Sequence, residues 1–222
     1  MKKVLVILLS AVLFATFASA ELLVTANPLG QGKWGVLGSY LTDSNVGSFV
    51  STLNATGLGG YVGYGLTDKL DLLVSLGQGT IGGLPAGVTM SQISYGANLK
   101  YTLMTEGKDL PVSVAIGAGY KAMTTTSAGF PGSGTTNGNQ IVVAAGVSKV
   151  IVPFVPYGGL TYRKTTSGGA DFSTQLDLTV GTAIAWSQQG AVFLEYSSQA
   201  VTPTAGGNYT NGEFALGVGY SI

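Results

Sequence analysis

Hydrophobic and polar residues alternate with a period of two along almost the whole chain from Lys33 onward. No helical period persists over a window of about 12 residues. This alternation predicts ten β-strands of about ten residues each, a length that suits a tilted strand crossing a membrane. We place them at residues 33–42, 55–66, 69–79, 91–103, 111–123, 140–149, 154–165, 173–186, 191–201 and 213–222.

Two kinds of connection alternate between these strands. The short ones are Thr67-Asp68 and residues 105–110, 150–153 and 187–190. The longer ones are rich in Gly, Ser, Thr and Asn, at residues 43–54, 80–90, 124–139, 166–172 and 202–212. The order predicts an all-β, antiparallel, up-and-down transmembrane barrel of about ten strands, with eight as the alternative. Its short turns would be periplasmic and its longer loops would lie outside the cell.

Each predicted strand has one apolar face and one small or polar face. The apolar face of 69–79 is Leu70, Leu72, Val74 and Leu76, and that of 173–186 includes Leu176, Leu178 and Val180. A soluble barrel would cover its outside with charges, yet only 9% of this chain is charged against about a quarter in soluble domains. We therefore expect the apolar face to contact lipid. A soluble, lipocalin-like ligand carrier is the alternative fold of this class.

The first twenty residues have the features of a signal peptide. Lys2 and Lys3 precede an apolar run, and Ala18-Ser19-Ala20 forms a small-residue cleavage site. We expect cleavage before Glu21, which leaves residues 21–222 as a single transmembrane barrel domain. The exported chain is expected in the outer membrane of a Gram-negative bacterium.

Aromatic residues on the apolar faces are predicted to form two belts at the membrane boundaries. The belt near the short turns comprises Trp34, Tyr64, Tyr101, Phe154, Trp186 and Tyr220. The belt toward the long loops comprises Tyr40, Tyr95, Tyr120, Tyr162, Tyr196 and Phe214.

Two segments resemble those of bacterial outer-membrane β-barrel proteins, in particular small barrels like OmpA and OmpW without a periplasmic domain. Residues 63–72 (GYGLTDKLDL) resemble their strand–turn–strand unit. Residues 214–222 (FALGVGYSI) resemble their C-terminal assembly signal, although Ile222 stands where Phe or Trp is usual. The resemblance implies outer-membrane lipid, periplasmic chaperones and the barrel assembly machinery as partners.

The polar faces predict a barrel lumen that contains charged and amide side chains. We expect Asp71 to approach Lys100, and Arg163 to approach Asp177 with Glu195 one strand further on, because buried charges need partners. These residues would either plug the lumen or line a constriction for small solutes. The full set is Asp71, Asn98, Lys100, Lys121, Arg163, Asp177, Glu195 and Glu213.

The composition removes several function classes. The chain has no Cys and no His, so it offers no thiolate zinc site and no histidine general base. Its formal net charge of zero removes the basic surface of a nucleic-acid binder. We expect a monomer without metal or cofactor that is not an enzyme and serves as a structural barrel or narrow passive channel. Surface adhesion through the loops is the alternative function.

Overall fold

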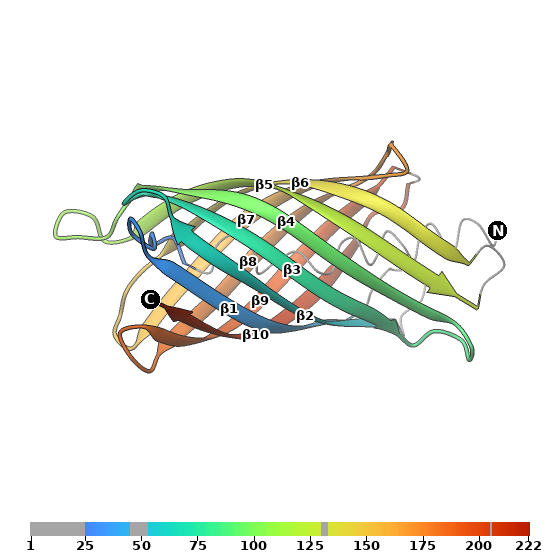
Figure 1. Cartoon of the computed structure of the whole chain (residues 1–222), viewed down its shortest axis with the longest axis horizontal. Helices are drawn as coiled ribbons and strands as arrows, with labels where there is room; N and C mark the ends of the chain where they lie inside the picture. Colours follow the sequence, from blue (N-terminus) through green and yellow to red (C-terminus); the bar gives the residue numbers. More distant parts are fainter. Residues whose placement is uncertain (1–24, 45–52, 130–132, 205) are drawn as a thin grey trace.

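The computed structural model describes residues 25–44, 53–129, 133–204 and 206–222, which form one closed antiparallel barrel (Figure 1). Each strand pairs with its neighbours in sequence, and β1 closes the barrel against β10. The predicted ten-stranded, up-and-down, all-β barrel is confirmed, and the eight-stranded alternative is wrong. The strands are β1 (Trp34–Ser44), β2 (Asn54–Gly65), β3 (Leu70–Gly82), β4 (Thr89–Met104), β5 (Ser113–Ala128), β6 (Gly134–Ser148), β7 (Phe154–Ser167), β8 (Ala170–Ala185), β9 (Gly190–Pro203) and β10 (Tyr209–Ser221).

Because the barrel is closed, the backbone N–H and C=O groups of every strand can pair with a neighbouring strand, and no sheet edge is exposed. The closing pair runs in continuous register from Gly35 opposite Ser221 to Ser44 opposite Gly212. The described residues contain no helix that is long and apolar enough to span a membrane. The predicted signal peptide lies outside the described residues.

The barrel has two distinct ends, which we name by their connections. The turn end carries the connections 66–69, 105–112, 149–153 and 186–189, and it also holds the start of β1 and the end of β10. The loop end is the opposite one, on the right in Figure 1.

The strands extend further toward the loop end than the sequence predicts. Pairing of β5 with β6 continues to Ser127 opposite Gly134, inside the predicted loop 124–139. The predicted loop 166–172 is wrong, because β7 and β8 are joined by Gly168-Gly169 alone, both with positive φ. Two such glycines form the tight turn that matches the twist of a hairpin. The Thr, Ser and Asn residues of these segments therefore continue the wall.

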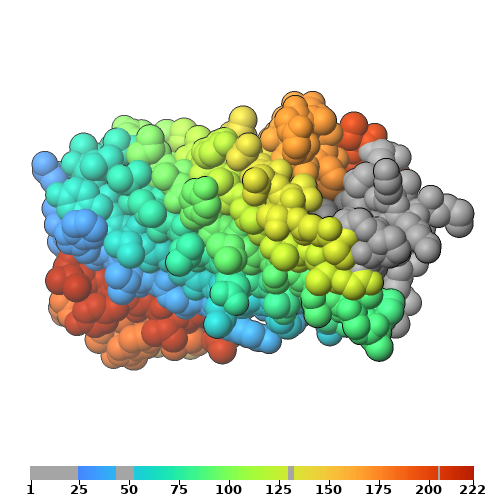
Figure 2. All heavy atoms as spheres, turned by 45° about the vertical axis from the view of Figure 1, so that its right-hand side comes forward, coloured from blue at the N-terminus to red at the C-terminus, as the bar shows by residue number. Residues whose placement is uncertain are grey.

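The outer surface is apolar from the turn end to the middle of the barrel and polar beyond it. Leu58, Leu76, Leu178 and Val218 are each more than half exposed on this surface. Neighbouring strands touch along the face shown in Figure 2. Toward the loop end the outward positions become polar, and we call this band the polar collar. It comprises Thr80, Ser91, Thr126, Thr135, Asn137, Asn139, Thr202 and Thr210.

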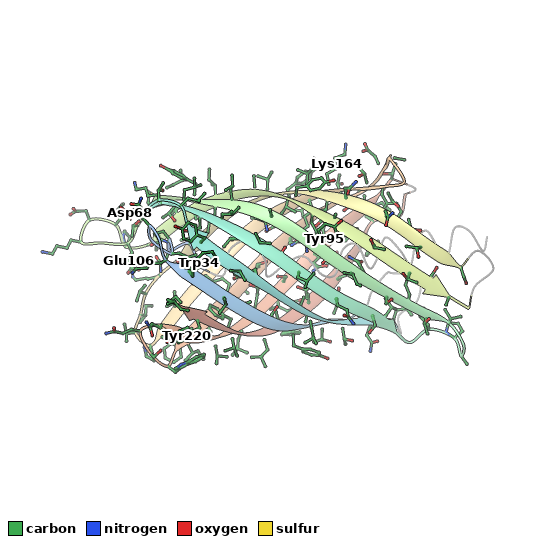
Figure 3. All side chains as sticks on the ribbon, in the orientation of Figure 1. Trp34, Asp68, Tyr95, Glu106, Lys164 and Tyr220 are labelled. Atoms are coloured by element: carbon green, nitrogen blue, oxygen red, sulfur yellow. The ribbon has the colours of Figure 1, made fainter. Side chains whose placement is uncertain are left out.

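The aromatic residues mark the limits of the apolar surface. Trp34 and Tyr220 lie at the turn end, whereas Tyr95 lies near the middle of the barrel length (Figure 3). Trp34 packs against Tyr64 with ring centroids 4.6 Å apart, and Tyr196 packs against Phe214 at 4.8 Å. Eleven of the twelve predicted belt residues are exposed and Tyr64 is half-buried: Trp34, Tyr40, Tyr64, Tyr95, Tyr101, Tyr120, Phe154, Tyr162, Trp186, Tyr196, Phe214 and Tyr220.

Candidate functional site

Charged side chains of the described residues avoid the apolar outer surface. The ion pair of Lys164 with Asp171, 2.9 Å between Nζ and Oδ2, lies exposed on the polar collar. The others lie in the turn-end connections or next to them, or face the lumen. The lumen is therefore the part of the barrel in which chemistry is concentrated, and it is the candidate functional site.

At the turn end, the segment before β1 lies inside the barrel. The amide of Leu29 donates to both carboxylate oxygens of Asp71 at 3.2 Å. Lys100 Nζ forms an ion pair with Asp71 at 3.0 Å and donates to the carbonyls of Thr25 (3.3 Å) and Asn27 (2.7 Å). The segment thus depends on the Asp71–Lys100 pair. Residues 25–29 are called the N-terminal segment below.

Three further hydrogen bonds fasten the N-terminal segment to the wall. The amide of Ala26 donates to Ser148 Oγ at 3.1 Å, the carbonyl of Ala26 accepts from Thr102 Oγ1 at 3.0 Å, and Ser113 Oγ donates to Asn27 Oδ1 at 2.6 Å. The segment is thus held by β3 and β4 and also by β5 and β6. A cavity of about 340 Å3 remains between this segment and the wall of β8–β10. The segment therefore covers only one side of the turn-end mouth.

Loss of the Asp71 carboxylate is expected to release the N-terminal segment. The chain has no Cys, so Ala26→Cys would introduce a single buried thiol as a reporter. Hydrogen bonds to a charged group contribute about 1.5–3 kcal/mol. Adding Asp71→Asn should therefore raise the labelling rate of Cys at position 26 by a water-soluble maleimide about tenfold or more.

Asp68→Asn serves as the control for this experiment, because the contact of its carboxylate with the described part of the N-terminal region is a long, exposed hydrogen bond of 3.4 Å from the amide of Gln31. Its labelling rate should stay close to that of Ala26→Cys alone. Equal rates in the Asp71 and Asp68 variants would show that Asp71 does not hold the segment.

A level of charged and amide side chains crosses the lumen further up. Its members are eight or nine residues from the turn end of their strands, so they lie at similar height. We call this level the mid-lumen ring. It comprises Asp43, Lys121, Gln140, Arg163, Asp177, Gln199 and Glu213, all buried.

The ring is connected by short polar contacts on β7–β10. Arg163 Nη1 lies 2.6 Å from Asp177 Oδ2, and both side chains are fully buried. Asp177 also accepts a bond of 2.6 Å from Gln175 Nε2. Gln199 Nε2 donates to Glu213 Oε2 at 3.2 Å. The charged side chains of the ring on β7, β8 and β10 therefore each contact either an opposite charge or the amide of a glutamine.

Below the ring, Glu195 accepts a bond of 3.1 Å from the Tyr157 hydroxyl. The carboxyl group of Glu213 interacts electrostatically with Asp43, Glu195 and Asp177 as well as with Arg163. The charges of β7–β10 and β1 therefore act on one another across a small region of the lumen.

At the level of the mid-lumen ring, β2–β4 carry glycine instead of a larger side chain. Gly57 on β2, Gly79 on β3 and Gly96 on β4 stand at the same height as the charged residues. Glycine on an inner face leaves space where a side chain would fill the lumen.

Neutral polar side chains accompany these glycines on β3–β5. Ser75, Gln92, Ser94 and Thr125 are buried, and their side-chain polar atoms have no hydrogen-bond partner within the described part of the chain. Buried polar groups are almost always paired with protein or water. These polar groups therefore need hydrogen-bond partners that the described residues do not supply.

An apolar cluster occupies part of the lumen toward the loop end, which the sequence analysis did not predict. It lies on one side, against β1–β4, β9 and β10. Thr125, Thr165 and Ser173 leave the other side polar at this height. The members of the apolar cluster are Leu41, Leu53, Ala55, Ile81, Leu84, Met90, Val201, Tyr209 and Ala215.

The structure buries all eight residues that the sequence predicts for the lumen, Asp71, Asn98, Lys100, Lys121, Arg163, Asp177, Glu195 and Glu213. It brings together Asp71 with Lys100, and Arg163 with Asp177. Their predicted roles as a plug or a constriction remain predictions.

The sequence-based prediction missed one charged lumen residue. Asp43, placed in the loop 43–54 by the sequence analysis, lies in β1 directly opposite Glu213. The signal that could have found it is the alternation of Leu37, Ser39 and Leu41, which continues inward to Asp43.

A second hollow, of about 890 Å3, lies over the outward glycines Gly38 and Gly60, which stand opposite each other on β1 and β2. Apolar side chains such as Leu58, Val62 and Leu76 surround it. It belongs to the apolar outer surface and carries no charged group.

The apolar outer surface, the aromatic residues at its limits and the closed, even-numbered wall together define an integral outer-membrane β-barrel. Solved outer-membrane proteins share this fold. The β domain of the Bordetella autotransporter BrkA has a TM-score of 0.50 and 16% identity, over 87% of this chain and 100% of that chain. At this identity the likeness establishes the fold alone.

Two further solved structures are similar at lower TM-scores. Neisserial surface protein A matches at 0.43 with 15% identity, over 85% of this chain and 95% of that one. The outer-membrane protease OmpT of Escherichia coli matches at 0.46 with 9% identity, over 86% and 96%. No family model matches the chain, and no curated protein matches it in sequence.

Proposed function

We propose that this protein is a narrow passive channel for ions and small solutes in the outer membrane. The observation that supports the proposal is the inner wall of β3–β5. There Ser75, Gln92, Ser94 and Thr125 present buried polar atoms without a hydrogen-bond partner among the described residues. An apolar or close-packed lumen would make these groups costly, whereas water in the lumen satisfies them.

The proposed path of a solute through the lumen has three parts. It enters at the turn end through the 340 Å3 cavity beside the N-terminal segment, which Lys100 also lines. It passes the mid-lumen ring on the glycine side, at Gly57 and Gly79, and leaves along the polar side of the loop end, near Thr165.

The absence of histidine from the sequence favours a channel over an enzyme. Hydrolases and acyltransferases usually require a general base whose pKa lies near neutrality, and histidine is the common one. The ion pair between Arg163 and Asp177 engages one of the carboxylates that a histidine-free hydrolase would need.

The channel is tested by placing a large side chain in the lumen at Gly59. This residue faces inward on β2, and a Cβ there would have only ordinary contacts, with Ser39 Oγ at 3.5 Å the nearest. The protein purified from membranes and inserted in a planar lipid bilayer should show steady, salt-dependent single-channel currents. Gly59→Trp should reduce the single-channel conductance while the barrel still folds, because the indole occupies part of the narrow path.

Gly38→Trp is the matched control. Gly38 precedes the inward Ser39 opposite Gly59 and faces outward. A Cβ added at Gly38 would have no atom within 4 Å, so the indole would point into lipid. The conductance of this variant should equal that of the wild type. Silence from folded, heat-modifiable wild-type protein would refute the channel and favour a structural barrel or adhesion through the loops.

A further inference from the structure

The carboxylates of the lumen gather where the barrel closes. Asp43 on β1 and Glu213 on β10 are direct partners in the strand register, and both are at least 98% buried. Glu195 follows on β9 and Asp177 on β8. Four consecutive strands of the closed sheet therefore carry one inward carboxylate each.

The cations of the lumen do not balance these carboxylates. Lys100 forms an ion pair with Asp71, and Arg163 forms one with Asp177. Among the described lumen residues, three carboxylates (Asp43, Glu195 and Glu213) and one cation (Lys121) remain to be counted. Glu195 and Glu213 are held by neutral donors, the Tyr157 hydroxyl and the Gln199 amide, which orient them without cancelling their charge. The described lumen has a formal excess of two negative charges.

Two of these carboxylates have an oxygen without a hydrogen-bond partner among the described residues. Glu195 Oε1 and Glu213 Oε1 are buried and have no hydrogen-bond partner within the described ranges. The wall across from them presents the glycines of β2–β4 and the unpartnered side chains of Ser75, Gln92 and Ser94. A solute in this part of the lumen therefore meets the carboxylates of β8–β10 and β1, the neutral groups of β2–β4, and Lys121 on β5.

We propose that this wall makes the lumen select small monovalent cations over anions, an inference that rests on the proposed channel function. Charges act strongly on an ion in a narrow path with walls of low dielectric constant, and acidic rings favour cations in known pores. The neutral side chains of β3–β5 supply oxygen atoms that replace part of the water around the ion. The backbone and hydroxyl dipoles of β2–β4 add no positive charge, and Lys121 on β5 is the opposing cation of the mid-lumen ring.

The test measures the reversal potential of single channels in a KCl gradient and converts it to the ratio of K+ to Cl− permeability. The wild type should have a ratio above one. Asp43→Asn/Glu213→Gln should bring the ratio toward one with current retained, because the amides keep the size of the carboxyl groups. Lys121→Gln should raise the ratio by removing the opposing charge.

Asp171→Asn is the control, because it removes a carboxylate on the outer surface and should leave the ratio unchanged. A folding failure of the double variant would leave Lys121→Gln and the wild type as the decisive measurements. A wild-type ratio at or below one, or a Lys121→Gln ratio no higher than that of the wild type, would overturn the selectivity while the channel stands. Absence of any current from the folded wild type would overturn the channel itself.

Discussion

Replacing Leu178 by arginine is expected to destabilise the barrel in lipid by about 2–4 kcal/mol, the cost of a cation near the bilayer midplane on the lipid face of a barrel. Leu178 is 56% exposed on the outer surface of β8. It lies between Trp186 at the turn end and the polar collar. Reversible urea unfolding in lipid vesicles measures the change.

Thr174→Arg is the matched control for the Leu178 variant. Thr174 lies on the same face of the same strand, four residues nearer the loop end. At this height the cost should be about 0–1 kcal/mol. Equal stability of the Leu178 and Thr174 variants would contradict the assignment of this face to lipid.

Replacing Arg163 by methionine is expected to cost about 3–5 kcal/mol of folding stability, the cost of leaving one member of a buried ion pair alone. The carboxylate of Asp177 is fully buried 2.6 Å from Arg163 Nη1, and the neutral Gln175 amide would remain as its donor. The same unfolding measurement applies, with the folded fraction checked by the heat-dependent gel shift.

The double variant Arg163→Met/Asp177→Leu supplies the control. It removes both charges, so most of the lost stability should return. A single-variant loss below about 1 kcal/mol, the range of solvent-exposed pairs, would instead show that water screens the two charges.

The strands and their faces could be predicted from the sequence because a period of two is a strong signal. Leu176 and Leu178 alternate with Gln175 and Asp177 throughout β8. The scarcity of charge then decided which face is outward. The approach of Asp71 to Lys100 also followed, since adjacent strands place opposite charges side by side.

The errors share one physical cause, the loop-end limits of the strands. Thr, Ser and Asn occur both in loops and on the polar surface of a strand, so their presence does not mark where pairing stops. Asp43, Leu53, Met90 and Tyr209 all fell in predicted loops and thus escaped the lumen. Because the strand limits were placed too early, neither the partner of Glu213 nor the apolar cluster was predicted.

The position of the N-terminal segment inside the barrel could not be predicted from the sequence, for a different reason. Residues 25–29 have no period, and their contacts are with single side chains far along the chain, as from Ala26 to Ser148. Such contacts depend on the closed barrel, because only closure brings β3 and β6 around the same mouth.

The height of the mid-lumen ring has an electrical consequence. The paired wall continues through the polar collar, so the insulated path of a conducting barrel is longer than the apolar band around it. The ring stands eight or nine residues along strands that reach sixteen residues in β4, β5 and β8. A charged blocker that stops at Asp43 and Glu213 therefore traverses a similar share of the membrane voltage from either mouth. Its block should change with voltage about equally steeply from the two sides, so the position of the ring can be measured from current alone.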